Sequence, residues 1–248
     1  MSDTVDTRVS LDLHPGNIEG MDLYDEDTRP VLAQAVGLLN STHSALVAIH
    51  DAKAAAATNP TLNEAAQLLA VDDYAGKRMG PVTREWDKTV RNLDSNIAMA
   101  EQELAAPLEQ KASQMVSGEL RAHFKAMKPG ERMAGVQAAI DTGDEVVVSA
   151  VLGAPAMLSG LTTDMQAALR QQWNEKANPV GAKRLRAMTA AKAYLDRCGG
   201  IVLKEWHDAV GVIEETKEGR NGRRIVARRI TAAEIRAQKT KADSAFVL

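Results

Sequence analysis

Two stretches of the sequence repeat apolar residues in steps of three and four, the spacing that buries one narrow face of a helix against another helix. In residues 31–58 the repeating positions are Leu32, Ala35, Leu39, Thr42, Leu46 and Ile49. In residues 81–106 they are Trp86, Val90, Leu93, Ile97, Ala100 and Leu104. The pattern predicts two long helices that pack along each other, within one chain or between chains. The candidate helix-interface residues are Leu39, Leu46, Trp86, Leu93, Ile97 and Leu104.

Prolines and capping residues predict where these helices begin and end. Pro30 and Pro81 each suit the first turn of a helix, and the first long helix is expected to stop at Asn59-Pro60. Thr61 and Glu64 have the spacing of a capping box, which predicts a short helix up to residues 76–80. Pro107 would remove a hydrogen bond inside the second long helix, whose stretch runs to Lys128, so a kink or a restart is expected at Pro107.

After residue 129 the predicted helices are shorter. They cover about 130–141, 144–152 and 155–160, then 163–178 behind a capping box at Thr163, 181–198 up to Gly199-Gly200, and 201–210. Asn221-Gly222 lies between two β-prone runs and predicts a hairpin. Thr231 and Glu234 form a further capping box, which opens a last helix to about residue 239.

The predicted fold is therefore all-α, a mainly helical bundle with two long heptad-patterned helices and a small β-hairpin near the C-terminus. Four consecutive segments are expected: an extended acidic arm (1–29), a long-helix bundle (30–128), a short-helix domain (129–209), and a basic hairpin with a C-terminal helix (210–248). Aromatic residues make up only 3% of the 248 residues, so small aliphatic side chains must fill the core.

Charge is concentrated at the two ends of a chain whose formal net charge is −3. Residues 1–29 hold eight acidic and two basic side chains, a net charge of −6. They form either a disordered tail or an arm that orders on a partner, with candidate contacts at Asp22, Asp25, Glu26 and Asp27. Residues 217–241 hold nine basic and two acidic side chains, a net charge of +7. The candidate partner or nucleic-acid contacts in this basic segment are Arg220, Arg223, Arg224, Arg228, Arg229 and Arg236.

The motifs of the common enzyme classes are missing from the sequence. There is no P-loop, no GxGxxG after a strand, no HExxH, no paired CxxC and no GxSxG. His43 and His50 lie seven residues apart, about 10 Å along a helix, which is too far for one metal ion. Cys198 is expected to be an inert, buried thiol. The expectation is therefore no catalytic residue, no metal and no cofactor, although fold alone does not exclude an enzyme.

The N-terminus is acidic and lacks the basic and apolar regions of a signal peptide, and no apolar run of about 18 residues is seen. No membrane contact is therefore expected.

A resemblance to known proteins lies in residues 130–178, in particular in Asp141-Thr142-Gly143-Asp144, Leu152-Gly153-Ala154-Pro155 and Leu158-Ser159-Gly160-Leu161. The stretch resembles uncharacterised helical proteins of tailed phages and prophages. The resemblance carries no active-site residue. It implies a location in the host cytoplasm during assembly and then in a virion.

These features predict a non-enzymatic structural or assembly protein, a phage virion component that oligomerises through its helices and its charged terminal arms. The expected partners are further copies of the chain and other virion proteins. The alternative is a nucleic-acid-binding protein that uses the basic C-terminal segment. No Tyr, Phe or Trp lies between residues 207 and 245, so base stacking is not expected and contact would be with the phosphate backbone.

Overall fold

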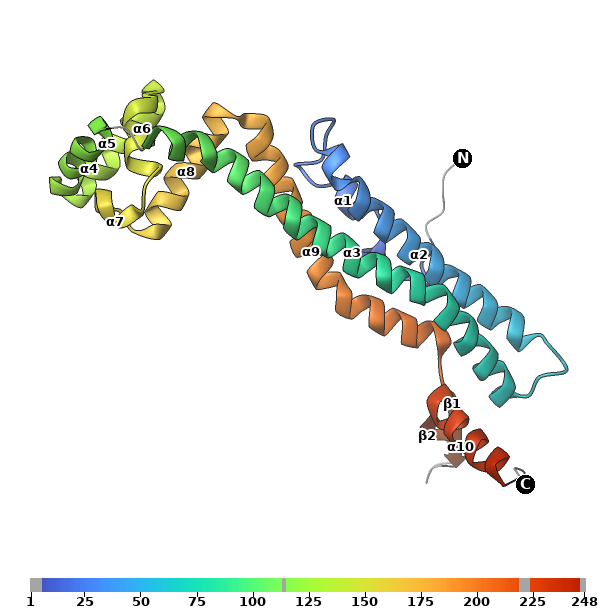
Figure 1. Ribbon diagram of the computed structural model, residues 1–248. Helices are drawn as coiled ribbons and strands as arrows, with labels where there is room; N and C mark the ends of the chain where they lie inside the picture. Colours follow the sequence, from blue (N-terminus) through green and yellow to red (C-terminus); the bar gives the residue numbers. More distant parts are fainter. Residues whose placement is uncertain (1–5, 113–114, 219–223, 246–248) are drawn as a thin grey trace. The chain divides into compact units, whose positions relative to one another are not determined.

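A computed structural model describes residues 6–112, 115–218 and 224–245 (Figure 1). Of the described residues 79% are helical, and a two-stranded antiparallel hairpin lies near the C-terminus, which confirms the predicted fold class. The described elements are the 3-10 helix η1 (Leu11–Leu13), the helices α1 (Gly16–Glu19), α2 (Arg29–Ala57), α3 (Glu64–Ala112), α4 (Met115–Ala126), α5 (Pro129–Thr142), α6 (Glu145–Leu152), α7 (Ala156–Ser159), α8 (Thr163–Ala177) and α9 (Pro179–Val210), the strands β1 (Ile213–Glu218) and β2 (Arg224–Ile230), and α10 (Ala232–Ser244).

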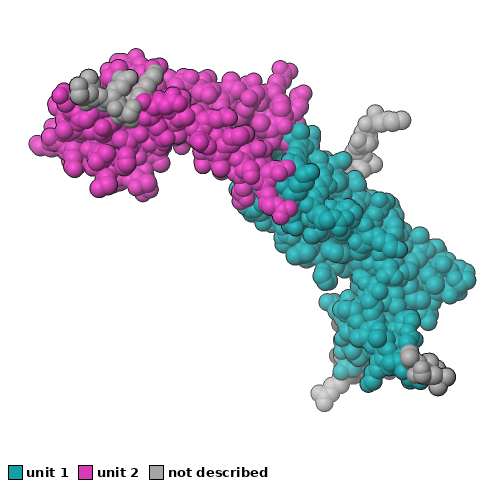
Figure 2. Space-filling view, viewed as in Figure 1, with its two compact units in different colours: residues 1–21, 33–90, 193–248 teal, residues 22–32, 91–192 magenta. Residues whose placement is uncertain are grey.

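The chain divides into two compact units (Figure 2). Unit 1 contains residues 1–21, 33–90 and 193–248, and unit 2 contains residues 22–32 and 91–192. This division differs from the four consecutive segments predicted from the sequence, because α2, α3 and α9 each contribute residues to both units.

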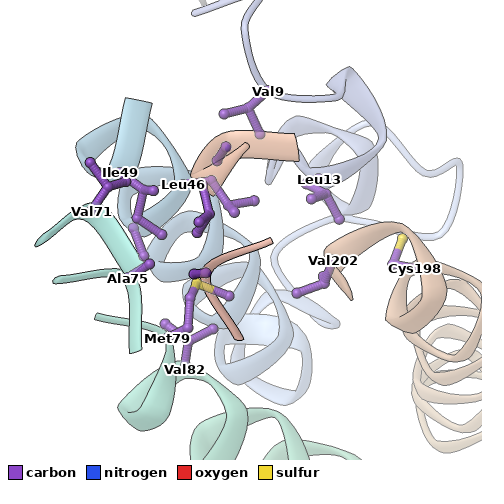
Figure 3. Packing of buried hydrophobic residues seen from close by; sticks show 14 of the residues in the cluster. Val9, Leu13, Leu46, Ile49, Val71, Ala75, Met79, Val82, Cys198 and Val202 are labelled. Carbon is purple, nitrogen blue, oxygen red and sulfur yellow. The ribbon is translucent and has the colours of Figure 1, made fainter. Parts of the chain in front are cut away.

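In unit 1, α2, α3 and α9 supply one apolar core (Figure 3). Leu46 and Ile49 of α2 meet the face of α3 that carries Val71, Met79 and Val82, and α9 adds Val202. Leu39 and Leu46 are fully buried, as their spacing predicts. Trp86, another predicted interface residue, is half-buried against this core.

The predicted break at Pro81 is wrong, since α3 runs without interruption from Glu64 to Ala112. Pro81 and Pro107 both lie on the exposed side of the helix, where water can satisfy the carbonyl groups that proline leaves unbonded. The cap also differs from the prediction. Asn63, not Thr61, accepts a hydrogen bond from the backbone N–H of Ala66, at 2.8 Å.

A second predicted break is also wrong, because Gly199-Gly200 lies inside α9 instead of ending a helix. The face of α9 that packs in unit 1 continues from Leu195 and Cys198 to Val202 and Ala209, all buried. Burial of this face outweighs the cost of glycine in a helix interior, about 1 kcal/mol per residue. In α8, the capping residue is Thr162, one position before the predicted Thr163.

The segment 6–20 is folded into unit 1, so the prediction of an extended arm is wrong over this part. Val9, Leu13 and Ile18 are fully or almost fully buried. The Tyr194 hydroxyl of α9 donates to the Asp12 carbonyl at 2.7 Å, and Arg8 pairs with Asp51 of α2 at 2.7 Å. A segment rich in acidic residues therefore orders on its own chain, because its few apolar residues have a core to enter.

Unit 2 holds a second core around Phe124, Ile140, Leu152, Leu169 and Trp173. On α3, the predicted interface residues Leu93 and Leu104 are buried, and Ile97 is half-buried.

Long polar side chains bind the ends of the short helices of unit 2. Arg132 donates to carbonyls at the end of α4, Arg170 donates to the Leu152 carbonyl that ends α6, and Lys176 donates to the last carbonyls of α5.

Of the helices that the structure describes, α2 is long and apolar enough to cross a membrane by length and composition. Core helices of water-soluble proteins pass the same test, and 44% of the most apolar 18-residue stretch of α2 is buried within the fold. The sequence predicted that no stretch of the chain could span a membrane. By length and composition alone, α2 is an exception to that prediction.

Candidate interaction surface at the end of helix α9

Among the described residues of unit 1, three hollows lie around the last turns of α9. The largest, about 660 Å³, is bounded by α9, the hairpin, α10 and single residues of α2 and α3. A second, of about 260 Å³, lies between α2, α3 and β1. The third, of about 160 Å³, lies between α3 and α9. Leu203 and Trp206 line both the first and the third, so these two hollows are adjacent.

The third hollow, which we name the tryptophan groove, is almost entirely apolar. It is lined by Val82, Thr83, Trp86, Asp87, Gly199, Val202, Leu203 and Trp206. Within it, Val82 and Val202 are buried, the two tryptophans are half-buried, and Leu203 is 58% exposed. Two of the chain's three tryptophans therefore lie beside an exposed leucine.

One position that lines the groove on α9 lacks a side chain. Gly199, Val202, Leu203 and Trp206 follow one another at helical spacings and share one face of α9. A methyl group built at Gly199 would meet no neighbouring atom within 4 Å, so this position is open space. Any larger residue there would begin to fill the groove between Trp86 and Trp206.

The largest hollow has charged side chains among its lining residues. In its lining Arg229 of β2 pairs with Glu214 of β1 at 3.1 Å. Gly211 joins α9 to β1 with φ +82°, a left-handed conformation that favours glycine, and the Lys53 ammonium occupies the space where a side chain at 211 would lie. The tight turn and the lysine together fix the direction in which the hairpin leaves α9.

The predicted basic contacts are divided by the structure. Arg220 and Arg223 lie outside the described residues, and Arg224 is described only as a backbone position of β2. Arg228 pairs with Glu234 at 3.4 Å and Arg229 with Glu214. Arg236 pairs with Asp72 at 2.8 Å and also with Asp73, whose hydrogen bond raises the pKa of the guanidinium above its usual range. The three described arginine side chains thus already bind carboxylates of their own chain.

The predicted acidic contacts are divided as well. Asp25 pairs with Lys183, and its carboxylate accepts backbone N–H groups of Asp27 and Thr28 at 3.0 and 3.2 Å. Asp22 and Glu26 are exposed. All of these contacts lie within unit 2, and a contact of these residues with another molecule stays a prediction.

The histidines predicted not to bind a metal pack under the N-terminal segment of unit 1. The His14 and His43 rings meet edge to face with centroids 5.6 Å apart. The Nε2 atoms of His43 and His50 are buried and have no hydrogen-bond partner. Burial lowers the pKa of both side chains, helped by His14 at His43 and by Arg8 at His50. Within the described part of the chain, no group of three or more His, Cys, Asp or Glu residues could hold a metal ion.

Cys198 is buried, and burial raises the pKa of its thiol, which disfavours the nucleophilic thiolate. Its neighbour Tyr194 is similarly affected: burial, followed by the contact with Cys198, raises the pKa of the phenol to about 12. Both side chains donate hydrogen bonds to the Asp12 carbonyl. Their geometry serves to hold the N-terminal segment on α9.

The tryptophan groove is the feature that the sequence pattern did not reveal. The sequence assigned Trp86 to a helix seam and Trp206 to a separate short helix, and it interpreted Gly199 as a helix end. The only signal in the sequence was the presence of glycine and tryptophan at helical spacing. Searches against protein-family models, curated proteins and solved structures found no match to this chain.

Proposed function

We propose that the chain is a non-enzymatic structural or assembly protein that forms homo-oligomers through the surface around the end of α9. The observation that carries this proposal is Leu203, 58% exposed in a groove between Trp86 and Trp206. Single exposed leucines are ordinary on protein surfaces, but a hollow with two tryptophans is not. Tryptophan is among the residues most enriched at the energetic centres of protein interfaces.

Coverage of this surface would contribute a useful share of an association energy. Complete burial of a leucine side chain is worth roughly 1.5–3 kcal/mol, and Leu203 has somewhat more than half of its surface left to bury. Further burial of Trp86 and Trp206 would add to that. Every 1.4 kcal/mol is about a tenfold change in a dissociation constant, so this one side chain should change self-association measurably.

A phage particle is the setting that we propose for this assembly. The resemblance of residues 130–178 to helical proteins of tailed phages supports this part of the proposal. The identity of the genes beside the one that encodes this chain tests the proposed phage setting. Capsid, portal or tail genes would support a virion component, whereas recombination or repressor genes would favour the alternative of nucleic-acid binding.

The alternative function, nucleic-acid binding by the basic C-terminal segment, has less support from the structure than from the sequence. Arg228, Arg229 and Arg236 would have to exchange carboxylates of their own chain for phosphates. Exposed ion pairs are weak, so the exchange is feasible in energy. However, the nearby Glu214, Asp72 and Asp73 would repel a phosphate backbone.

The test is the mass of the purified full-length protein, measured by light scattering over a wide range of concentration. The wild type should show a mass that increases with concentration. Leu203→Glu should weaken self-association at least about tenfold, because it places a charge in an apolar interface. Leu11→Glu is the matched control: Leu11 belongs to the same unit, is 59% exposed and lies outside the three hollows.

Two results would contradict the proposal. One is a wild type that stays monomeric at every concentration. The other is a wild type that self-associates while Leu203→Glu and Leu11→Glu behave alike, which would place the interface elsewhere. Thermal unfolding of both variants shows whether the glutamate has damaged the fold itself.

A further inference from the structure

The C-terminal hairpin is exposed on both faces along most of its length. Every described side chain at 214–217 of β1 and at 226–229 of β2 is exposed, including Val226 at 46%. At the end nearest α9, Ile213 packs against the core of unit 1. A two-stranded hairpin without an apolar face against the protein is marginally stable in water.

The outer edges of both strands are also unpaired. β1 and β2 bond to each other, and in the described part of the chain no other backbone hydrogen bond reaches either strand. Each edge therefore offers a row of free N–H and C=O groups, which is a template for another strand. A third strand would satisfy these groups and give the hairpin the support that its own chain does not supply.

The two strands carry opposite charges. β1 contains Glu214, Glu215 and Glu218, and β2 contains Arg224, Arg228 and Arg229. The register places each glutamate opposite an arginine: Glu214 with Arg229, Glu215 with Arg228 and Glu218 with Arg224. Of these pairs, Arg229 and Glu214 form an ion pair at 3.1 Å. The register leaves the hairpin with one mainly acidic edge strand and one mainly basic edge strand.

The charges of the two strands determine which strand of another copy can pair with each of them. Symmetric pairing of β1 with β1 would bring glutamates together, and symmetric pairing of β2 with β2 would bring arginines together, and both arrangements are disfavoured. Pairing of β1 with the β2 of another hairpin brings each charge next to its opposite. The chain thus contains, on its two strands, the two complementary halves of an interface.

We propose that the outer edge of β1 in one copy pairs with the outer edge of β2 in the next copy. This inference rests on the proposed self-association and names one of its interfaces. The contact is heterologous, because each copy uses a different strand toward each neighbour, so it repeats until it closes into a ring or continues. The acidic partner of the basic strand β2 is then β1 of the neighbouring copy.

A charge-swapped variant separates this proposal from its alternatives. The substitutions Glu214→Arg, Glu215→Arg, Arg228→Glu and Arg229→Glu exchange the charges of the two strands. They keep opposite charges across the hairpin, so its register should persist. Arg228→Glu also removes the exposed ion pair with Glu234, and such pairs are weak. The variant should also still associate with itself. Mixed with the wild type, however, its basic β1 meets the basic β2 of the wild type, and its acidic β2 meets the acidic β1.

The experiment measures energy transfer between donor-labelled and acceptor-labelled full-length proteins, with circular dichroism as the check of folding. Wild type with wild type and swapped with swapped should co-assemble, and the mixed pair should be at least about tenfold weaker. Amides of residues 213–217 and 226–230 should exchange hydrogen more slowly in the assembly than in diluted protein, because the outer edges become paired.

Each other outcome overturns the proposal in a distinguishable way. Equal co-assembly of all three pairs means that the hairpin edges are not at the interface, while the proposed self-association stands. A mixed pair that is tighter than either parent means symmetric β1–β1 or β2–β2 contacts. No association of the wild type at any concentration means that the proposed function itself fails.

Discussion

Arg132 should be the most important single polar side chain for the stability of unit 2. Its Nε donates to the Phe124 carbonyl at 2.8 Å, and its Nη2 donates to the carbonyls of Met127 at 2.8 Å and Lys125 at 3.0 Å. Its Nη1 donates to the Gly160 carbonyl at the end of α7. The last carbonyls of a helix have no partner within the helix, so one guanidinium serves the end of α4 and ties α7 to it.

We expect Arg132→Met to destabilise unit 2 by about 2–4 kcal/mol. A hydrogen bond from a charged donor contributes about 1.5–3 kcal/mol net, but four bonds from one partly exposed guanidinium are not additive. Methionine keeps most of the aliphatic stem, so the change measures mainly the loss of the donors. For comparison, whole domains are stable by about 5–15 kcal/mol.

The assay is hydrogen exchange followed by mass spectrometry, because it reports on unit 2 separately from unit 1. Peptides from α4 and α7 should lose protection in Arg132→Met, together with the rest of unit 2 if it opens cooperatively. The control is Arg186→Met, since Arg186 pairs with Glu175 at 3.0 Å on the surface and should contribute less than about 1 kcal/mol. If the two variants were equally stable, Arg132 would have no special role.

The sequence pattern predicted local structure well where two signals agreed. The spacing of Leu39, Leu46 and Leu93 predicted burial, and all three residues are buried. Thr231 and Glu234 predicted a capping box, and the structure has it, with the Thr231 hydroxyl accepting from the Glu234 N–H at 3.3 Å. The hairpin on either side of Asn221-Gly222 is confirmed in its two strands, although the turn lies outside the described residues.

Prediction failed where tertiary packing overrides a local signal. Pro81 and Gly199-Gly200 are strong breakers in an isolated helix, yet α3 and α9 continue through them because the same helical face stays in a core on both sides. The N-terminal segment failed for the opposite reason. Its composition is typical of a disordered tail, but Val9 and Leu13 are buried in the core of unit 1. No local sequence pattern predicts this burial.

The candidate surface depends on contacts between distant parts of the sequence. Trp86 and Trp206 are far apart along the chain, and their common groove is visible only once α3 and α9 are packed. The basic segment was found from composition, but its count began at Lys217 and left out Glu214 and Glu215. The strand register shows that these two glutamates are the counterparts of Arg229 and Arg228. Charge composition therefore located the basic segment, and the strand pairing showed that an acidic strand lies beside it.

Two further outcomes test the cores of the two units. Leu93→Asp should destabilise unit 2 by about 3–5 kcal/mol in urea unfolding, because Leu93 is 2% exposed and the carboxylate would be buried without a partner, whereas Met99→Asp on the exposed side of α3 should change little. In unit 1, stability should decrease as the pH falls below about 6.5, the ordinary histidine pKa. Burial lowers the pKa of His43 and His50 in the folded state, so below that pH the unfolded chain binds protons that the folded chain does not, and the stabilisation present at higher pH is lost. The charged and titratable groups that act on these rings are Asp6, Arg8, His14, Lys53 and Glu205. The melting temperature of His43→Gln/His50→Gln should depend less on pH between 7.5 and 5 than that of the wild type or of the exposed control His207→Gln. Equal pH dependence in all three proteins would show that these imidazoles are not held neutral by the fold.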